Sequence, residues 1–371
     1  MVSRLTAAMR DNDVDAIVVS SPENYAWLTG YVVPSHPLMR WRHAIAVMTA
    51  DGRCTLLSVD MEATTVRRRF PDVEVHEWKE FSYDAVPRLA DLLQSLGLQR
   101  ARVGMEMDYF PAGDFAALAT LVPDATFSAV EALLARLRQL KTPAEIDILR
   151  RLSMIADSSI HTAYRSVGPG DTEFDIAGAL TGAMYENGAE YFKLMIIATG
   201  DRSRLPNVGP TDRVLAPGDV CRVEVFPIID GYHAGVCRTA AVAHAPPQAE
   251  DIWARLTECK HMLLDVIRPG AVCSELYRQY AGKLEALGLP LIPFVGHGIG
   301  LHLHEDPYVA EFCDQPLEAG MVLGIEPLIY ETGHGFGMQN KDLVAVTETG
   351  CELLSAFTDT DRLMIVGNEG A

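Results

Sequence analysis

Long apolar runs are missing from this 371-residue sequence. No segment approaches the roughly 18–20 consecutive apolar residues that a membrane-spanning helix needs. The stretch 1–14 contains Arg4, Arg10, Asp11 and Asp13, and it has neither the apolar centre nor the small-residue cleavage site of a secretory signal. We therefore expect a cytoplasmic protein with no membrane partner.

Paired cysteines and an excess of positive charge are also missing. The seven cysteines are scattered and none forms a CxxC pair, so neither a disulfide framework nor a zinc knuckle is expected. The 31 Lys and Arg residues are outnumbered by 50 Asp and Glu residues, which gives a net charge of −19. This charge argues against nucleic acid as a partner and leaves a small-molecule substrate as the expected ligand.

What the sequence does have is enough length and apolar content for two domains, each with its own core. The first third alternates short strands with helices, and we found no internal repeat in the chain. Strands are predicted at 15–20, 44–49, 54–59 and 101–106, and helices at 85–96 and 112–121. The strands 44–49 and 54–59 flank the turn Ala50-Asp51-Gly52 and are predicted to form a hairpin. This pattern predicts a small α/β domain over residues 1–130.

The pattern changes at residue 131, where long helical segments begin. Thr142 and Pro143 interrupt them as a helix cap and a first-turn proline, with Glu145 near the positive helix end. Further on, helices are followed by strands and Gly-rich turns, including predicted strands at 296–304, 321–330 and 341–347. Residues 131–371 are therefore a predicted second domain, and the fold class is α+β.

Four segments of the second domain carry chemically active residues: 222–240, 296–307, 320–330 and 337–350. Glu224 lies in an otherwise apolar strand, so it needs either an ion pair, with Lys341 or Arg222, or a catalytic role as base or nucleophile. His302 and His304 alternate beyond His297 and are predicted to share one face of a strand.

The order and spacing of these four segments resemble the creatinase/aminopeptidase P/prolidase family, whose catalytic domain has the pita-bread fold. The resemblance covers essentially the whole chain and includes the junction LRQLKTPAEIDILRR at 137–151. It implies a creatinase-like N-terminal domain followed by a pita-bread catalytic domain. It also implies a homodimer in which each active site is shared between subunits.

In metallopeptidases of that family, five side chains hold two metal ions. The resemblance places their positions on Glu224, Gly235, His297, Glu326 and Lys341, with His304 as a second histidine of the site. Gly235 cannot bind a metal and Lys341 brings a positive charge, which we expect to pair with Glu224 and Glu326. We therefore predict no metal and no other cofactor, with a single ion on Glu224, His297 and Glu326 as the open alternative.

The chain is closest in character to the metal-independent creatinase-like and ectoine-hydrolase-like branches. FPIIDGY at 226–232 resembles a creatinase segment, and Tyr232 and His233 resemble a pair in ectoine hydrolases. Cys237 stands where creatinase has a guanidinium-binding glutamate, so creatine is a doubtful substrate. The predicted substrate-binding residues are Arg42, Trp41, Arg202, Arg204, Tyr232, His233 and Cys237, the first two reaching across from the other subunit.

The predicted function is hydrolysis of a C–N bond other than an ordinary peptide bond (an amide, amidine or ring amide) in a small polar nitrogen compound. Glu224 would act as base or nucleophile, His297 and His304 would transfer protons, Glu326 would hold a cationic or N–H group, and Lys341 would order the carboxylates. Three alternatives remain: an Xaa-Pro-type metallopeptidase with a reduced metal site, a lyase, and a non-catalytic binding relative on the same fold.

Overall fold

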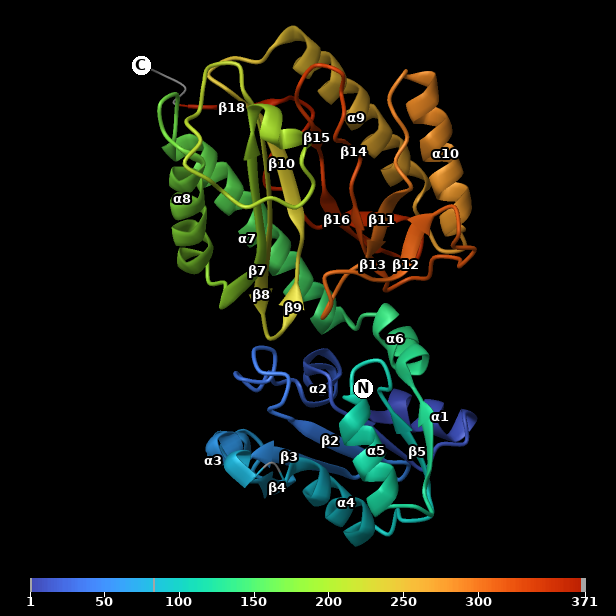
Figure 1. Cartoon of the computed structure of the whole chain (residues 1–371). Helices are drawn as coiled ribbons and strands as arrows, with labels where there is room; N and C mark the ends of the chain where they lie inside the picture. Colours follow the sequence, from blue (N-terminus) through green and yellow to red (C-terminus); the bar gives the residue numbers. More distant parts are fainter. Residues whose placement is uncertain (1, 83, 368–371) are drawn as a thin grey trace. The chain divides into compact units, whose positions relative to one another are not determined.

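The chain forms two compact units, Met1–Arg138 and Gln139–Ala371 (Figure 1). This computed structural model describes residues 2–82 and 84–367. Both units combine helices with sheets, which confirms the predicted α+β class. Within the described ranges, no helix combines the length and the apolar character needed to cross a bilayer.

The first unit is built on a six-stranded sheet in the order β4-β3-β2-β1-β5-β6. The strands are β1 (Ala16–Val19), β2 (Ile45–Thr49), β3 (Cys54–Val59), β4 (Glu74–Trp78), β5 (Arg102–Met105) and β6 (Thr126–Ala129). The helices are α1 (Val2–Asp11), α2 (Pro22–Thr29), α3 (Asp60–Arg69), α4 (Ala85–Ser95), α5 (Ala112–Leu121) and α6 (Glu131–Gln139). The predicted hairpin is confirmed, since β2 and β3 pair antiparallel.

The second unit contains two larger sheets, ordered β18-β10-β8-β7 and β12-β11-β13-β16-β17. The first comprises β7 (Tyr191–Thr199), β8 (Val220–Ile229), β9 (Tyr232–His233), β10 (Val236–Val242) and β18 (Met364–Val366). The second comprises β11 (Phe294–Gly298), β12 (Glu305–Ala310), β13 (Val322–Ile325), β16 (Asp342–Val346) and β17 (Cys351–Leu353), and β14 (Leu328–Ile329) pairs separately with β15 (Met338–Gln339).

Four long helices accompany these sheets: α7 (Pro143–Ser166), α8 (Glu173–Glu186), α9 (Pro247–Val266) and α10 (Cys273–Ala286). Helix α7 begins where its sequence predicts, because Thr142 and Glu145 form a reciprocal capping box. Figure 1 shows α7 and α8 beside the first sheet, and α9 and α10 beside the second. Each half of the unit thus supplies two helices and then antiparallel strands, a repetition not visible in the residue pattern.

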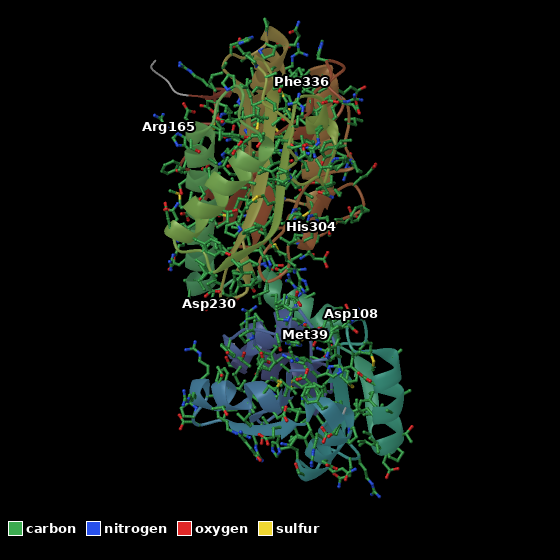
Figure 2. All side chains as sticks on the ribbon, turned by 60° about the vertical axis from the view of Figure 1, so that its left-hand side comes forward. Met39, Asp108, Arg165, Asp230, His304 and Phe336 are labelled. Atoms are coloured by element: carbon green, nitrogen blue, oxygen red, sulfur yellow. The ribbon has the colours of Figure 1, made fainter. Side chains whose placement is uncertain are left out.

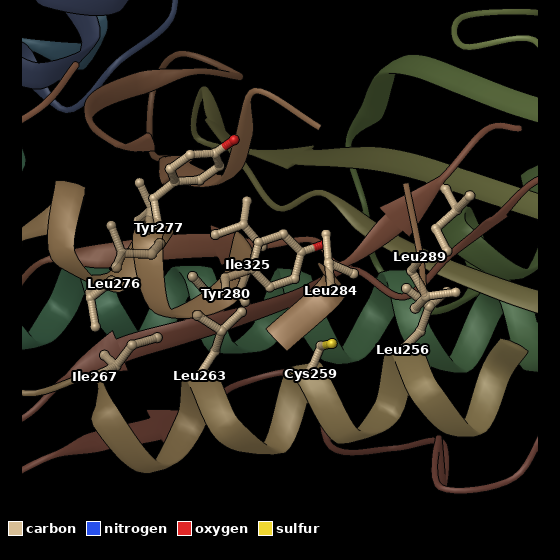
Figure 3. Close-up of a cluster of buried hydrophobic side chains, with 14 of the residues drawn as sticks. Leu256, Cys259, Leu263, Ile267, Leu276, Tyr277, Tyr280, Leu284, Leu289 and Ile325 are labelled. Carbon is tan, nitrogen blue, oxygen red and sulfur yellow. The ribbon is translucent and has the colours of Figure 1, made fainter. Parts of the chain in front are cut away.

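Apolar side chains of α9 and α10 close the outer side of the second sheet. Leu256, Cys259 and Leu263 on α9 face Tyr280 on α10 and Ile325 on β13, and all five are buried (Figure 3). Burying one such side chain stabilises the fold by about 1.5–3 kcal/mol. Because Ile325 directly precedes Glu326, this packing also fixes the backbone from which Glu326 projects.

Two predicted strands are shorter than expected. Strand β11 ends at Gly298, and residues 300–304 form bends, so the prediction that His302 and His304 share one face of a strand is wrong. The predicted strand 321–330 is interrupted at Glu326 and Pro327. Pro327 has no N–H to donate to a neighbouring strand, which favours a break at this point.

A buried ion network joins the two sheets of the second unit. Asp342 accepts from the Arg238 guanidinium at 2.7 Å and from the Lys260 ammonium at 3.0 Å, and Arg238 also pairs with Asp157 at 2.8 Å. Burial alone would raise the pKa of Asp342, but the charges of Arg238 and Lys260 outweigh it and lower that pKa. The network fixes the first residue of β16, next to Lys341.

We predict that Asp342→Asn lowers the free energy of unfolding by about 3–5 kcal/mol, because it leaves buried cations without a full counter-charge. Because the folded-state pKa of Asp342 is lowered, its contribution is present above about pH 4 and is lost as the pH falls through the folded value. Urea unfolding at several pH values measures both effects. Asp361→Asn, which removes an exposed pair with His261, is the matched control and should cost under about 1 kcal/mol. Equal losses in the two variants would contradict a special role for the network.

Candidate active site

Lys341 lies at the centre of the candidate site, immediately before β16. Its backbone bridges to β10 through two reciprocal hydrogen bonds with Cys237, each 3.2 Å long. The Arg238 guanidinium donates a further hydrogen bond to the Lys341 carbonyl at 2.8 Å. The lysine side chain is only 1% exposed, so its ammonium has to find its partners within the protein.

The ammonium has three such partners. Lys341 Nζ lies 3.0 Å from Glu224 Oε1, 3.3 Å from Glu326 Oε2 and 3.3 Å from His297 Nε2. An ammonium has three hydrogens, so all three are engaged. Burial alone would lower the pKa of Lys341, but the charges of Glu224 and Glu326 outweigh it and raise that pKa, which keeps the lysine charged.

Glu224 reaches the ammonium from the middle of β8. In the antiparallel register it lies opposite Cys237 on β10 and Ile196 on β7. All ten residues of β8 are buried, so the carboxylate is surrounded by protein on the strand that carries it. The ion pair with Lys341 supplies the partner that a carboxylate in an apolar strand requires.

His297 presents a ring nitrogen to the ammonium. Its Nδ1 donates to the Gly298 carbonyl at 2.8 Å, and since a carbonyl can only accept, Nδ1 carries the proton. In the neutral ring Nε2 is then an acceptor, and it faces Lys341 Nζ. Opposite His297 on β13 is Gly324, where a Cβ atom would lie 3.3 Å from Lys341 Cε. A glycine therefore lets the lysine pass close to this strand.

Glu326 has one engaged and one open carboxylate oxygen. Oε2 accepts from Gln339 Nε2 at 3.0 Å and faces Lys341, whereas Oε1 is buried and receives no hydrogen bond from any described residue. Burial alone would raise the pKa of Glu326, but the Lys341 charge outweighs it and lowers that pKa. The open oxygen is an acceptor within 3.3 Å of His297 Nε2, where a ligand N–H or a water could donate.

The sequence predicts the place of Gln339 and Arg222 in this site only in part. Gln339 lies two positions before Lys341, so strand alternation favours the same face, yet nothing in the pattern marks it as a partner of Glu326. Its Oε1 accepts from Arg222 Nη1 at 3.1 Å. The Arg222 guanidinium also donates to the carbonyls of Ser203, Leu205 and Pro206 and stacks over Tyr330.

His304 lies against the outer side of His297. The two rings are stacked, with centroids 3.7 Å apart and planes 13° apart, and His304 Nδ1 lies 3.3 Å from the Tyr308 hydroxyl. Loss of water around the ring and the nearby positive groups lower the pKa of His304 to about 4, so it is neutral at pH 7. His304 is exposed, whereas His297 is buried. Figure 2 shows His304 well separated from Phe336 within this unit.

The ring of Phe226 occupies the space beside Gly235. A Cβ atom at Gly235 would overlap this ring, so no side chain could project from position 235 without moving it. The same ring faces the ammonium, with Lys341 Nζ 4.9 Å from its centroid. Phe226, whose side-chain direction the sequence does not reveal, therefore forms an apolar wall on this side of the site.

Most predicted substrate-binding residues of the second unit have structural partners. Tyr232 donates to Glu145 at 2.8 Å, and the His233 ring contacts the Gly300 carbonyl. Arg202 pairs with Glu173, and Arg204 pairs with Glu331 at the surface. Cys237 is fully buried beside Glu224, and burial raises the pKa of its thiol well above the usual range.

Arg42 and Trp41 belong to the first unit. Arg42 forms a two-point ion pair with Glu80, at 2.6 and 3.0 Å. Trp41 is 60% exposed, which is unusual for so large an aromatic side chain. Their proposed role across a subunit interface stays a prediction.

Comparison with known proteins supports the predicted family. Residues 147–348 match metallopeptidase family M24, and residues 1–140 match the creatinase/prolidase N-terminal domain. An Xaa-Pro dipeptidase from Pyrococcus furiosus is 25% identical over 98% of this chain and 99% of its own length. The crystal structure of dipeptidase PepE from Mycobacterium ulcerans superposes with a TM-score of 0.84 at 25% identity, covering 99% and 97% of the two chains. X-Pro aminopeptidase from Thermotoga maritima shares the fold, with a TM-score of 0.85 at 22% identity over 99% of both chains.

These relatives overturn three predictions. The predicted metal-independent hydrolase of C–N bonds other than peptide bonds is wrong, because the full-length relatives are named as Xaa-Pro dipeptidases and the matched family is one of metallopeptidases. The same match contradicts the prediction that no metal is used. The closeness to creatinase and ectoine hydrolase is not supported either. It rested on short motifs, which are weaker than a match along the whole chain.

The arrangement of donors in this chain nevertheless does not fit a pair of metal ions. Divalent cations in proteins are held at about 2.0–2.6 Å, whereas Glu224, Glu326 and His297 lie 3.0–3.3 Å from Lys341 Nζ, a spacing suited to an ammonium. Among the residues described, no three His, Cys, Asp or Glu side chains are grouped so that they could hold a metal. The family's metal chemistry and this site therefore disagree at Lys341.

Family membership itself rests on more than this one site. The two sequence matches together span the chain from residue 1 to residue 348 and follow the order of the two compact units. The shared fold extends over essentially the full length of the compared structures. The chain belongs to metallopeptidase family M24, with an N-terminal domain of the creatinase/prolidase type.

Proposed function

We propose that the protein is a peptidase of the Xaa-Pro dipeptidase type, which hydrolyses the peptide bond of a short substrate at the site around Glu326. The observation that carries this proposal is the open, buried Oε1 of Glu326, close to His297 and to the neutral ring of His304. The names of the full-length relatives supply the substrate class. The similarity of fold alone would not identify the substrate class, because one fold serves many reactions.

Each residue of the site has a proposed task. Glu326 Oε1 accepts a hydrogen bond from the attacking water or from the substrate N–H, while Oε2 stays held by Gln339. His304, neutral at pH 7 and exposed, exchanges a proton with solvent at the outer side of the site. Lys341 holds both carboxylates in place, because its ammonium pairs with Glu224 and with Glu326.

A second candidate function is the binding of short peptides or small carboxylates without turnover. The observation in its favour is that all three hydrogens of the Lys341 ammonium are engaged by the protein. A site in which the central cation is already satisfied has less to offer a reacting carbonyl oxygen. Calorimetric binding of an Xaa-Pro dipeptide without release of free proline would favour this second candidate.

We expect the full-length protein to release proline from dipeptides such as Met-Pro and Ala-Pro, and not from Pro-Ala or N-acetylated controls. The assay is run with metal-free protein and with added Mn²⁺, Co²⁺ or Zn²⁺, and the products are analysed by mass spectrometry in ¹⁸O-labelled water. Hydrolysis must place one solvent oxygen in the released N-terminal amino acid. No cleavage of any dipeptide under any of these conditions would contradict the proposed function.

Glu326→Gln should lower kcat/KM for the cleaved dipeptide by about 100-fold or more, because removing a positioned acid–base group typically costs about 10²–10⁴-fold. Glu331→Gln is the matched control, since Glu331 is exposed and its carboxylate pairs with Arg204 at the surface. Circular dichroism and melting temperature establish that both variants are folded. Activity retained in folded Glu326→Gln would remove this carboxylate from the chemistry.

We also propose that the protein acts as a homodimer in which Arg42 and Trp41 complete the partner's site. Arg42→Ala should then raise KM with little change in kcat, since a remote binding contact is removed. In a mixed dimer of one Arg42→Ala chain and one Glu326→Gln chain, one of the two sites combines an intact Glu326 with an intact Arg42 from the other chain. That site should have normal activity, and the other site should carry both changes. A monomer in analytical ultracentrifugation, or kinetics identical to those of the unmodified protein, would contradict this arrangement.

A further inference from the structure

Two cysteines of the second unit lie side by side although they are far apart in the sequence. Cys273 is the first residue of α10, and Cys313 lies in the segment that follows β12. The Cys273 N–H donates to the Gln315 carbonyl at 3.0 Å. The Ser274 N–H donates to the Cys313 carbonyl at 2.8 Å, and an antiparallel bridge continues this pairing on the other side of Cys273. The backbone therefore holds the two cysteines as close neighbours.

The two thiols differ in their access to solvent. Cys273 is fully buried in the apolar core that α9 and α10 form with the second sheet, whereas Cys313 is half-buried at the edge of that core. Burial raises the pKa of the Cys273 thiol to about 12, and the neighbouring Cys313 thiol contributes to this shift through its charge and through a hydrogen bond. A thiol attacks as its thiolate, so Cys313 is the member of the pair that an oxidant from solution meets first.

The segment that carries Cys313 has room to adjust its position. Residues 311–315 form a turn and irregular backbone, outside any helix or strand. Phe312, next to Cys313, is 76% exposed, so dissolved molecules reach this segment. A disulfide bond is about 2.05 Å long, which is shorter than any contact between two separate thiols. Oxidation therefore requires a small shift, and the irregular segment can make it more easily than the helix.

We propose that Cys273 and Cys313 form a site of reversible oxidation, at which a low-molecular-weight disulfide such as glutathione disulfide converts the two thiols into one intramolecular disulfide bond. The Cys313 thiolate attacks one sulfur of the oxidant, which forms a mixed disulfide and releases the first glutathione thiol. The Cys273 sulfur then attacks the Cys313 sulfur, loses its proton and releases the second glutathione thiol. The protein gives up two electrons and two protons, and the two glutathione molecules receive them.

The new bond ties the start of α10 to the segment after β12. Strand β12 begins at Glu305, directly after His304, so the cross-link acts on an element next to the candidate active site. A cross-link restricts the unfolded chain more than the folded one, and oxidation should therefore raise the melting temperature. Both thiols lie outside the group of residues around Lys341, so their oxidation does not depend on the proposed function.

The experiment treats the folded, full-length protein with glutathione disulfide, blocks the remaining thiols by alkylation, and digests the product with trypsin without reduction. Each of the seven cysteines lies in a different tryptic peptide, so mass spectrometry identifies the linked pair. We expect the peptides of Cys273 and Cys313 to be joined and the melting temperature to rise by several degrees, with both changes reversed by dithiothreitol. Absence of this linked peptide, or a glutathione that stays attached to Cys313, would overturn the proposal.

Cys313→Ser should abolish both the linked peptide and the rise in melting temperature, and Cys313→Ala serves as a second variant if Cys313→Ser fails to fold. Cys351→Ser is the matched control, because Cys351 is also half-buried but its thiol donates to the Leu264 carbonyl. It should form the linked peptide as the unmodified protein does. If oxidation raised the melting temperature of Cys313→Ser as much as that of the unmodified protein, the stabilisation could not come from this pair.

Discussion

The ion cluster formed by Lys341 with Glu224, Glu326 and His297 is the interaction on which the second unit depends. It joins strands of both sheets at one buried point, and each member would be costly to bury alone. The positive charge is matched by two carboxylates, one of which retains an open oxygen. The site is therefore net acidic at its centre, in keeping with a family whose members hold cations.

A second buried cluster, around Asp342, supports the first from the adjacent residue. Its members lie on α7, α9, β10 and β16, so two helices and both sheets converge behind Lys341. Arg238 takes part in this cluster and also binds the carbonyl of Lys341 itself. Helix α9 contributes to both kinds of contact, since it carries Lys260 of this cluster and also packs apolar side chains with α10 against the second sheet.

Residue patterns predicted the features that depend on neighbours in sequence. The cap at Thr142, the hairpin of β2 and β3, and the two-unit α+β plan all follow from local spacing and turn chemistry. Glu224 could be singled out because a carboxylate in an apolar strand needs a partner, and family order pointed to Lys341. Helix α3 was missed because only Ala63 and Val66 of its ten residues are buried, which leaves no apolar periodicity to detect.

Other features depend on contacts between distant segments and could not be predicted in this way. Nothing local shows that Tyr232 bonds to Glu145 rather than to a substrate, or that the Phe226 ring turns over Gly235. The alternation argument for His302 and His304 failed because the chain leaves the sheet at Gly298. Motif likeness to creatinase misdirected the functional prediction, since a few matching residues are compatible with several branches of one fold.

Arg222 has a consequence for how this site can change over time. A single guanidinium holds three carbonyls of the segment 203–206 and, through Gln339, the carboxylate of Glu326. The conformation of that surface segment and the orientation of the Glu326 carboxylate are therefore coupled through Arg222. An insertion or deletion between Ser203 and Pro206 would change the orientation of the Glu326 carboxylate even in the substrate-free protein. The loop, Arg222 and Gln339 are therefore free to vary only together.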